Sequence, residues 1–284
     1  TRLAFNTTFY TYNDIARAAQ MVQVDLEPDA IGRYFPIAIG SVGDCGAFAA
    51  ALGRELADFK APTGWSDRLK SFASARDALW RERDEKGAAT RTPFAAETVF
   101  REVRSVLPRS AIVTLDAGTM CLQATDQLRY MTVPGLITPL DFGLVGFSYA
   151  AGLGAKAAAP DRPVLSLMGD GGFAMTMAEI TTAVQSGLPT VCLVLDNGSW
   201  GAEKAYQRDF YNGRYIGADI ISPAYDKVAE LCGAKGYRAD KPGEIAAALS
   251  DAFASGRPAV IQAKVDPNAI VSFRRDAFKH RSGG

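Results

Sequence analysis

Oxygen-bearing side chains follow two apolar segments in the middle of the chain, in an order that suits metal chemistry. Asp170 lies in Gly-Asp-Gly-Gly directly after Pro163–Leu167, and Asn197 follows Thr190–Leu195 one strand–helix–strand unit later. The carboxyl ends of neighbouring parallel strands meet at one edge of a sheet, so we expect the two side chains to converge there. Carboxylate and amide oxygens suit Mg²⁺, which takes its remaining ligands from phosphate and water. The spacing therefore predicts a magnesium-diphosphate site.

The residues after Asp170 support the same interpretation. Backbone amides at Gly171, Gly172 and Phe173 can face the same point, because glycine lets a ligand approach the backbone closely. Two ordinary turns between buried elements would also explain Gly-Asp-Gly, and the spacing by itself leaves that alternative open.

The elements that must position these residues alternate regularly from residue 94 onward. Strands followed by helices of 10 to 15 residues are typical of an α/β protein with a parallel sheet and helices on both faces. We predict helices over Phe94–Leu107, Met120–Leu128, Leu144–Ala159, Thr176–Ser186, Ala224–Cys232 and Gly243–Phe253, and strands over Ala111–Leu115, Pro163–Leu167, Thr190–Leu195 and Ala259–Val265.

The first part of the chain has a different organisation. Strands are predicted over Gln20–Asp25 and Ile37–Asp44, followed by a helix over Gly46–Phe59. A charged helix over Ser66–Lys86 then lies between two linkers. The chain begins without Met, and its first residues resemble the end of a domain whose beginning is missing.

Composition excludes several classes of function. The 31 basic residues balance 31 acidic ones, so nothing favours nucleic acid or an anionic membrane surface as a partner. The four cysteines lie far apart without a Cys-x-x-Cys pair, which predicts buried free thiols and a cytoplasmic protein. No apolar run is long enough to span a membrane, and no signal peptide is visible.

Gly-Asp-Gly followed by Asn at this distance is the signature of thiamine-diphosphate enzymes, and the sequence resembles that family. The resemblance implies thiamine diphosphate and Mg²⁺ as cofactors, with the metal bound by Asp170, Asn197 and the backbone carbonyl of Ser199. The family usually has Asn-Asn after the second strand. Here the first of these positions is Asp196, which brings a second carboxylate near the site.

Two further segments match the family in the same order. Asp116–Met120, "DAGTM", resembles the segment that closes over the diphosphate. Phe142–Lys156 resembles the stretch beneath the thiazolium ring, and Val145 takes the place of the bulky residue that holds the cofactor bent. By its size alone, Val145 could equally be an ordinary core residue. The cofactor-binding residues implied by the resemblance are Gly118, Thr119, Gly143, Val145, Gly169, Gly171, Gly172 and Phe173.

The resemblance covers essentially the whole chain and implies its domains. Residues 1–60 match the C-terminal part of a Rossmann-like central domain, 61–93 a linker with a helix, and 94–284 the diphosphate- and Mg²⁺-binding domain. The family's N-terminal pyrimidine-binding domain, which carries the catalytic Glu, has no counterpart here. We therefore expect a pyrimidine-binding domain from another chain or a missing half as partner, in a homodimer or homotetramer.

One stretch points to a branch of the family. Asn197–Gly217, with Trp-Gly-Ala-Glu-Lys, resembles sulfoacetaldehyde acetyltransferases, and so does the tail Ser272–Arg281. The resemblance implies conversion of sulfoacetaldehyde and phosphate into acetyl phosphate and sulfite. Because both substrates are small anions, a cation must contact them, and Lys204 is the best single candidate. Solvated surface charge is the alternative for Lys204 and for the other nearby cations, which are Arg208, Arg214, Arg274, Arg275 and Lys279.

Other interpretations remain open at this point. Gly152–Ala157, "GLGAKA", loosely matches a dinucleotide-binding fingerprint, but it lies inside a predicted helix instead of opening one after a strand. An acetolactate-synthase-like carboligase or a 2-oxo-acid decarboxylase would share the fold. The chain could also be a cofactor-carrying subunit or fragment that is inactive without its partner domain.

Overall fold

The computed structural model describes residues 15–16, 18–89, 91–139 and 142–272. The chain divides into two compact units between Ala78 and Leu79. This point lies inside the continuous helix α2 (Trp65–Gly87), close to the predicted bounds of the charged helix. The ranges 1–60, 61–93 and 94–284 stay a prediction for the domains of the protein.

The described part of the first unit contains a two-stranded parallel sheet, helix α1 and the beginning of α2. Strand β1 (Val22–Asp25) pairs with β2 (Ile39–Val42), and a 3-10 turn, η2 (Pro28–Ala30), lies between them in sequence. Helix α1 (Cys45–Glu55) begins where the carboxylate of Asp44 accepts the N–H of Ala47 at 2.7 Å, which satisfies one of the free donors of the first turn.

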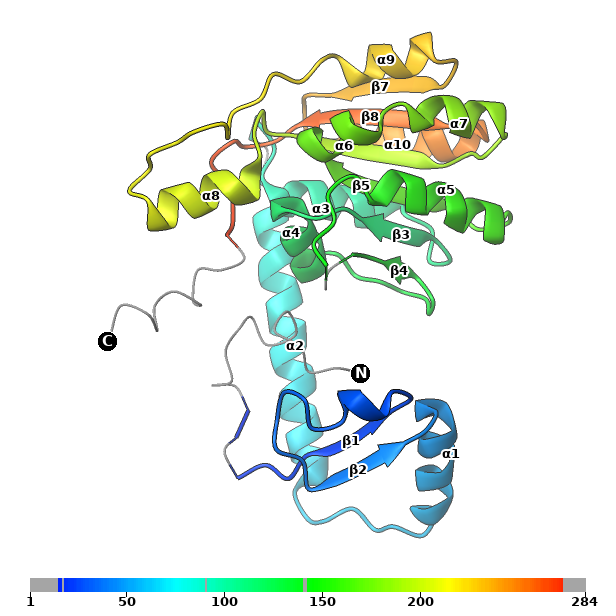
Figure 1. Ribbon diagram of the computed structural model, residues 1–284, viewed down its shortest axis with the longest axis vertical. Coiled ribbons are helices and arrows are strands. Elements are labelled where there is room, and N and C mark those ends of the chain that lie inside the picture. The colour runs from blue at the N-terminus through cyan, green and yellow to red at the C-terminus, as the bar shows by residue number, and fades with distance from the viewer. Residues whose placement is uncertain (1–14, 17, 90, 140–141, 273–284) are drawn as a thin grey trace. The chain divides into compact units, whose positions relative to one another are not determined.

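The second unit is built on a six-stranded, entirely parallel sheet with strand order β4-β3-β5-β6-β8-β7 (Figure 1). Its strands are β3 (Ile112–Leu115), β4 (Leu136–Ile137), β5 (Val164–Gly169), β6 (Val191–Asp196), β7 (Lys235–Ala239) and β8 (Ala259–Lys264). Its helices, besides the end of α2, are α3 (Ala96–Val106), α4 (Thr119–Gln127), α5 (Ser148–Ala158), α6 (Asp170–Thr176), α7 (Glu179–Gln185), α8 (Gly201–Phe210), α9 (Tyr225–Leu231) and α10 (Glu244–Ser255).

Helices cover both faces of this sheet, which confirms the predicted α/β fold. On β6, Val191, Leu193 and Leu195 pack in one core with α3, α4 and α10. Cys192 and Val194, between them in sequence, pack in a second core with α5, α6, α7 and α9. Successive strand residues point to opposite faces, so a strand covered on both sides is apolar throughout.

Three parts of the predicted element pattern were wrong. The helix predicted over Thr176–Ser186 corresponds to α7, but a separate helix that was not predicted, α6, precedes it and begins at Asp170 itself. The helix predicted from Leu144 begins only at Ser148, because Gly143 and Gly146 have positive φ angles of 70° and 81°. Elements β4, α8 and β7 were not predicted. Their sequences are short or mostly polar, so contact with neighbouring elements decides them more than periodicity does.

The position of Gly152 shows why glycine occurs in the stretch Gly152–Ala157, which loosely matches a dinucleotide-binding fingerprint. The stretch lies inside α5, as predicted, and a Cβ at Gly152 would lie 2.2 Å from Oγ of Ser166 on β5. Glycine therefore lets this helix approach the sheet closely, which is a packing role.

The cysteines and the membrane prediction can also be compared with the structure. All four cysteines are free, and Cys121 and Cys192 are buried as predicted, whereas Cys45 is exposed and Cys232 half-buried. Within the described ranges, no helix combines the length and the apolar character that crossing a membrane requires.

Candidate functional site

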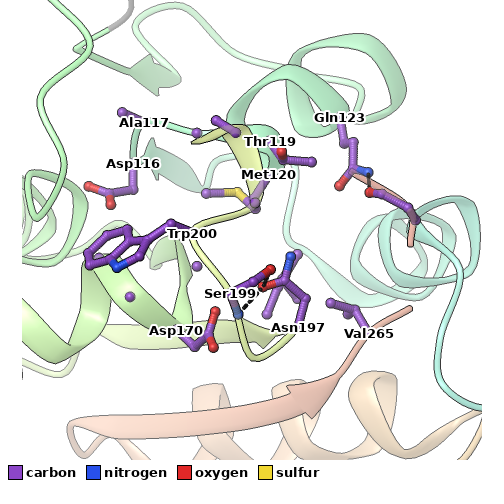
Figure 2. Close-up of a pocket in the computed structure, with 18 of the residues that line it drawn as sticks. Asp116, Ala117, Thr119, Met120, Gln123, Asp170, Asn197, Ser199, Trp200 and Val265 are labelled. Carbon is purple, nitrogen blue, oxygen red and sulfur yellow. Dashed lines mark hydrogen bonds between the residues drawn. The ribbon is translucent and has the colours of Figure 1, made fainter. Parts of the chain in front are cut away.

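A pocket lies at the carboxyl ends of β3, β5 and β6, which are neighbours in the sheet. The loops that follow these strands carry the sequence motifs singled out above, so the strand order brings the motifs together. Figure 2 shows side chains from these loops pointing toward one space. Its lining includes Asp116–Met120, Gln123, Val145, Gly169–Gly172, Asn197, Ser199–Glu203, Val265, Asp266 and Ala269.

Nine of the twelve site residues predicted from the sequence line this pocket. They are Gly118, Thr119, Val145, Gly169, Asp170, Gly171, Gly172, Asn197 and Ser199. The other three, Gly143, Phe173 and Lys204, do not line it.

Asp170 and Asn197 are held in one hydrogen-bonded loop system. The Asp170 carboxylate is buried, and its Oδ2 accepts the N–H of Gly198 at 3.0 Å and the hydroxyl of Ser222 at 2.7 Å. Oδ1 of Asn197 accepts the N–H and the hydroxyl of Ser199 at 3.0 and 3.2 Å. Gly198 has φ 66°, a conformation that favours glycine, so it lets the chain turn between Asn197 and Ser199.

Electrostatics distinguish Asp170 from Asp196, the buried aspartate at the end of β6. Burial raises the pKa of the Asp170 carboxyl to about 6, the hydrogen bond from Ser222 opposes the shift, and the charge of Asp196 adds to it. Asp196 is fully buried and does not line the pocket. Its Oδ2 instead pairs with the Lys264 ammonium at 2.6 Å and accepts from Gln262 at 2.7 Å. Groups on β8 thus neutralise and hydrogen-bond the unusual carboxylate of Asp196, and of these two aspartates only Asp170 lines the pocket.

Gly171 and Gly172 form the first turn of α6, and neighbouring side chains leave no room for a Cβ at either. A Cβ at Gly171 would lie 2.8 Å from the Trp200 ring, and one at Gly172 would lie 2.1 Å from Oδ2 of Asp116. The first N–H groups of a helix have no intrahelical acceptor. The backbone N–H groups of Gly171 and Gly172 therefore fit the role predicted for them, which is to face a diphosphate in the pocket.

Trp200 and three acidic side chains line the pocket without having been named as individual site residues, although Asp116 lies in the predicted segment Asp116–Met120. The indole of Trp200 covers Gly171, and in Figure 2 it lies between Asp116 and Asp170. Glu203 and Asp266 supply the other unpredicted carboxylates. The position of Trp200, directly after the metal loop, was the one signal in the sequence that could have identified it.

Phe173 and Gly143 lie outside the pocket for different reasons. The Phe173 ring is fully buried and contacts Tyr149 and Tyr225 edge-on, with centroid distances of 5.8 and 5.0 Å. Its side chain therefore anchors α6 in the core. Gly143 lies in the segment before α5, where its positive φ turns the chain toward Val145.

Lys204 makes contacts away from the pocket. Its ammonium pairs with Asp219 at 2.5 Å and lies 5.4 Å from the centroid of the Tyr215 ring. Arg208 donates to Asp209 and to the carbonyl of Ile270. The cations predicted in the tail, Arg274, Arg275 and Lys279, lie outside the described residues.

The charge of the lining determines what can bind. Its ionisable side chains are Asp116, Asp170, Glu203 and Asp266, and no Lys, Arg or His of the described chain lines it. Although Asp266 pairs with Arg91 at 3.2 Å, this excess of carboxylates disfavours an anionic ligand unless a cation accompanies it. The oxygens of Asp170 and Asn197 and the Ser199 carbonyl suit Mg²⁺. This set contains a single carboxylate, so it is compatible with the absence of any cluster of three His, Cys, Asp or Glu among the described residues.

Comparison with family models decides the family. Residues 116–263 match the model described as "Thiamine pyrophosphate enzyme, C-terminal TPP binding domain". The chain belongs to the thiamine pyrophosphate enzymes. The matched range contains the loops after β3, β5 and β6, and thus most of the pocket lining.

Similar thiamine pyrophosphate enzymes include several named for one reaction. A sulfoacetaldehyde acetyltransferase of Alcaligenes xylosoxydans xylosoxydans is 32% identical over 92% of this chain and 48% of its own length. A probable acetolactate synthase large subunit of Methanococcus aeolicus is 24% identical over 90% of this chain and 45% of its own. The chain spans about half the length of the curated relatives it matches.

A solved structure supports the fold. The thiamine diphosphate-dependent 4-hydroxybenzoylformate decarboxylase of Rhodococcus jostii RHA1 matches with a TM-score of 0.70 and 21% identity, over 88% of this chain and 45% of that one. At this identity the likeness supports the thiamine-diphosphate-enzyme fold and not the substrate.

Proposed function

We propose that the pocket binds thiamine diphosphate together with Mg²⁺. The observation that carries this proposal is the donor set at the strand ends, in which oxygen ligands converge in a pocket without a basic side chain among the described residues. A diphosphate bound there needs a divalent cation, since the four carboxylates of the lining would otherwise repel it.

Each group of residues has a distinct role in this proposal. Asp170, Asn197 and the Ser199 carbonyl would bind Mg²⁺, and the backbone of Gly169–Gly172 would lie against the diphosphate. Gly118 and Thr119 would close over it, and Val145 would support the cofactor ring. When bound, thiamine diphosphate supplies carbanion chemistry at a carbonyl carbon. The protein contributes the position and the conformation of the cofactor.

We propose that the whole protein is an acetyltransferase that converts sulfoacetaldehyde and phosphate to acetyl phosphate and sulfite. The support is the similarity to sulfoacetaldehyde acetyltransferases over 92% of the chain. The acetolactate synthase relative favours a carboligase as the second candidate. Activity would require a pyrimidine-binding domain, supplied by a missing half or by another chain of a homodimer or homotetramer. The exposed side chains of Leu144 and Met175, near the pocket, are candidates for such a contact.

A substrate panel tests the function. The chain is assayed alone and with a pyrimidine-binding half for sulfite, carbon dioxide and acetolactate, and its mass is measured by light scattering. Phosphate-dependent sulfite release by an assembled dimer or tetramer is expected. Acetolactate formation without sulfite release would favour the carboligase. Full activity of a monomeric chain would refute the requirement for a second domain.

Lys204 is proposed to contact phosphate or the sulfonate, which requires it to leave Asp219. For Lys204→Ala, phosphate affinity or turnover in the assembled enzyme is expected to fall about ten- to a hundredfold, since one charge-assisted hydrogen bond is lost. Phosphate-dependent sulfite release is the measurement. Asp219→Ala is the matched control, because it frees the ammonium and should not weaken phosphate binding. Unchanged phosphate saturation in Lys204→Ala would exclude this role.

Mg²⁺ binding is expected to weaken below about pH 6. The pKa of Asp170 is raised to about 6, and a protonated carboxyl does not bind the metal. Affinity should therefore be constant above this pH and fall about tenfold for each pH unit below it. Calorimetry with Mg²⁺ and thiamine diphosphate between pH 5 and 8 measures this dependence. Constant affinity down to pH 5 would contradict the assignment of Asp170 as a ligand.

A further inference from the structure

Asp116 lies where the segments around the pocket meet. It follows β3, is 1% exposed, and donates its backbone N–H to the carbonyl of Leu167 on β5 at 3.0 Å. Its carboxylate accepts three backbone N–H groups, those of Gly146 at 3.1 Å, Phe147 at 2.7 Å and Ser148 at 3.1 Å. One side chain thus satisfies donors at the start of α5, although it lies about thirty positions earlier in the chain.

The same carboxylate contacts the first turn of α6. A Cβ at Gly172 would lie 2.1 Å from Oδ2 of Asp116 and 3.4 Å from Cγ1 of Val145. A heavy atom cannot be placed 2.1 Å from a non-bonded oxygen. Position 172 can therefore carry no side chain while Asp116 keeps its three hydrogen bonds.

In the described part of the chain, hydrogen bonds fix the segment before α5 at its two ends, and Gly146 packs against α6 near Thr176. The segment is neither helix nor strand, and the side chains of Phe142 and Leu144 are 86% and 47% exposed. At its beginning, the N–H groups of Phe142 and Gly143 donate hydrogen bonds to the carbonyl of Pro139. The Asp116 carboxylate fixes the end of the segment through the N–H groups of Gly146 and Phe147, which directly follow Val145. Burial of the segment's own side chains contributes little to holding it in place.

We propose that Asp116 is the positioning residue of this pocket. Its carboxylate holds the segment 143–147 against the first turn of α6, so that Val145 faces the pocket. Gly172 is glycine because the carboxylate occupies the space of its side chain. Asp116 acts through the segment and not on a reacting atom. Only the consequence for thiamine diphosphate affinity rests on the proposed function, since the consequence for the segment can be measured without any ligand.

Hydrogen–deuterium exchange tests the inference on the free protein. In Asp116→Asn the side chain keeps its shape and loses its charge, and an NH₂ group replaces one of the two accepting oxygens, so that it faces at least one backbone N–H. We expect exchange at Gly146, Phe147 and Ser148 to accelerate about ten- to a hundredfold, as the loss of a hydrogen bond to a charged group implies. Exchange in β6 should not change. Thr114→Val is the matched control, because it removes a buried hydroxyl that bonds the Ser148 carbonyl without touching the carboxylate.

A double-mutant cycle tests the pairing with Gly172. Gly172→Ala should displace the carboxylate and accelerate exchange at the same three amides. In the Asp116→Ala background the added methyl group has room, so it should change exchange less than threefold. The cycle remains informative if Asp116→Asn folds poorly, because Gly172→Ala disturbs the same contact through a residue of α6 and leaves Asp116 unchanged.

Calorimetry of the four proteins of this cycle with Mg²⁺ and thiamine diphosphate gives the functional consequence. We expect each single variant to bind about tenfold or more weakly, and the double variant to bind no more weakly than Asp116→Ala. If the affinity losses of Asp116→Ala and Gly172→Ala multiply in the double variant, the proposed contact between the two residues is overturned. Unchanged amide exchange in Asp116→Asn would overturn the positioning role. If the parent protein binds no thiamine diphosphate, the proposed function fails while the exchange experiments still decide the role of Asp116.

Discussion

Asp170→Ala is expected to lose binding of Mg²⁺ and thiamine diphosphate by about a hundredfold or more. Replacing a group that only orients a metal ligand costs 10- to 100-fold in affinity, so removing the sole carboxylate of the proposed ligand set should cost at least the upper value. Asp170 also accepts the N–H of Gly198 and the hydroxyl of Ser222, so its loss loosens the loop that carries Asn197. Isothermal titration calorimetry of the cofactor in the presence of Mg²⁺ is the measurement.

The control for Asp170→Ala is Asp226→Ala, which deletes another buried carboxylate outside the pocket lining. Its affinity should stay within about twofold of the parent. Circular dichroism of both variants would separate lost binding from lost folding. Undiminished binding in a folded Asp170→Ala protein would remove Asp170 from the metal site and leave the magnesium proposal without its carboxylate.

Phe173→Ala is expected to lower the free energy of unfolding by about 3–5 kcal/mol, the cost of emptying a fully buried phenylalanine site. The ring contacts Tyr149 and Tyr225 and anchors α6 from the core side, while the backbone of the same turn faces the pocket. Phe173→Leu should cost less than about 1.5 kcal/mol, because it keeps most of the volume. Urea unfolding followed by circular dichroism measures both values.

Cofactor affinity of Phe173→Leu decides whether the aromatic side chain has more than a packing role. If the ring only anchors α6, affinity should stay within about threefold of the parent. A large loss of affinity in a stable Phe173→Leu protein would show that the ring itself contributes to cofactor binding, beyond the backbone N–H of Phe173 that was predicted to face the site. Phe142→Ala is a control for stability, because that ring is 86% exposed and should contribute little.

Much of the site followed from local patterns in the sequence. The apolar segments before Asp170 and Asn197 are β5 and β6, and these strands are neighbours in the sheet, as the spacing required. Hydrophobic runs bounded by glycine and polar residues are local signals, so strands buried on both faces could be recognised without knowledge of their neighbours. The same locality explains why Gly152–Ala157 was assigned correctly to a helix.

Errors arose where the outcome depended on distant residues. No helix was predicted before Thr176, but α6 begins at Asp170, where Tyr225 donates its hydroxyl to the Asp170 carbonyl and Phe173 enters the core. The helix predicted from Leu144 starts only after Gly146, which has a positive φ, and the Asp116 carboxylate accepts N–H groups at its beginning. Neither contact leaves a periodic trace in the sequence.

Residue type and spacing by themselves predicted the α/β class and the strand-end oxygens at Asp170 and Asn197, because they carry that information directly, and the family followed from the resemblance of the motifs. Only the tertiary structure decided that Lys204 pairs with Asp219 away from the pocket, that Trp200 covers Gly171, and that Asp116 holds the segment with Val145. Those arrangements depend on strand order and on the directions of side chains from separate loops. Both arise from packing across the sheet, which no local stretch of sequence specifies.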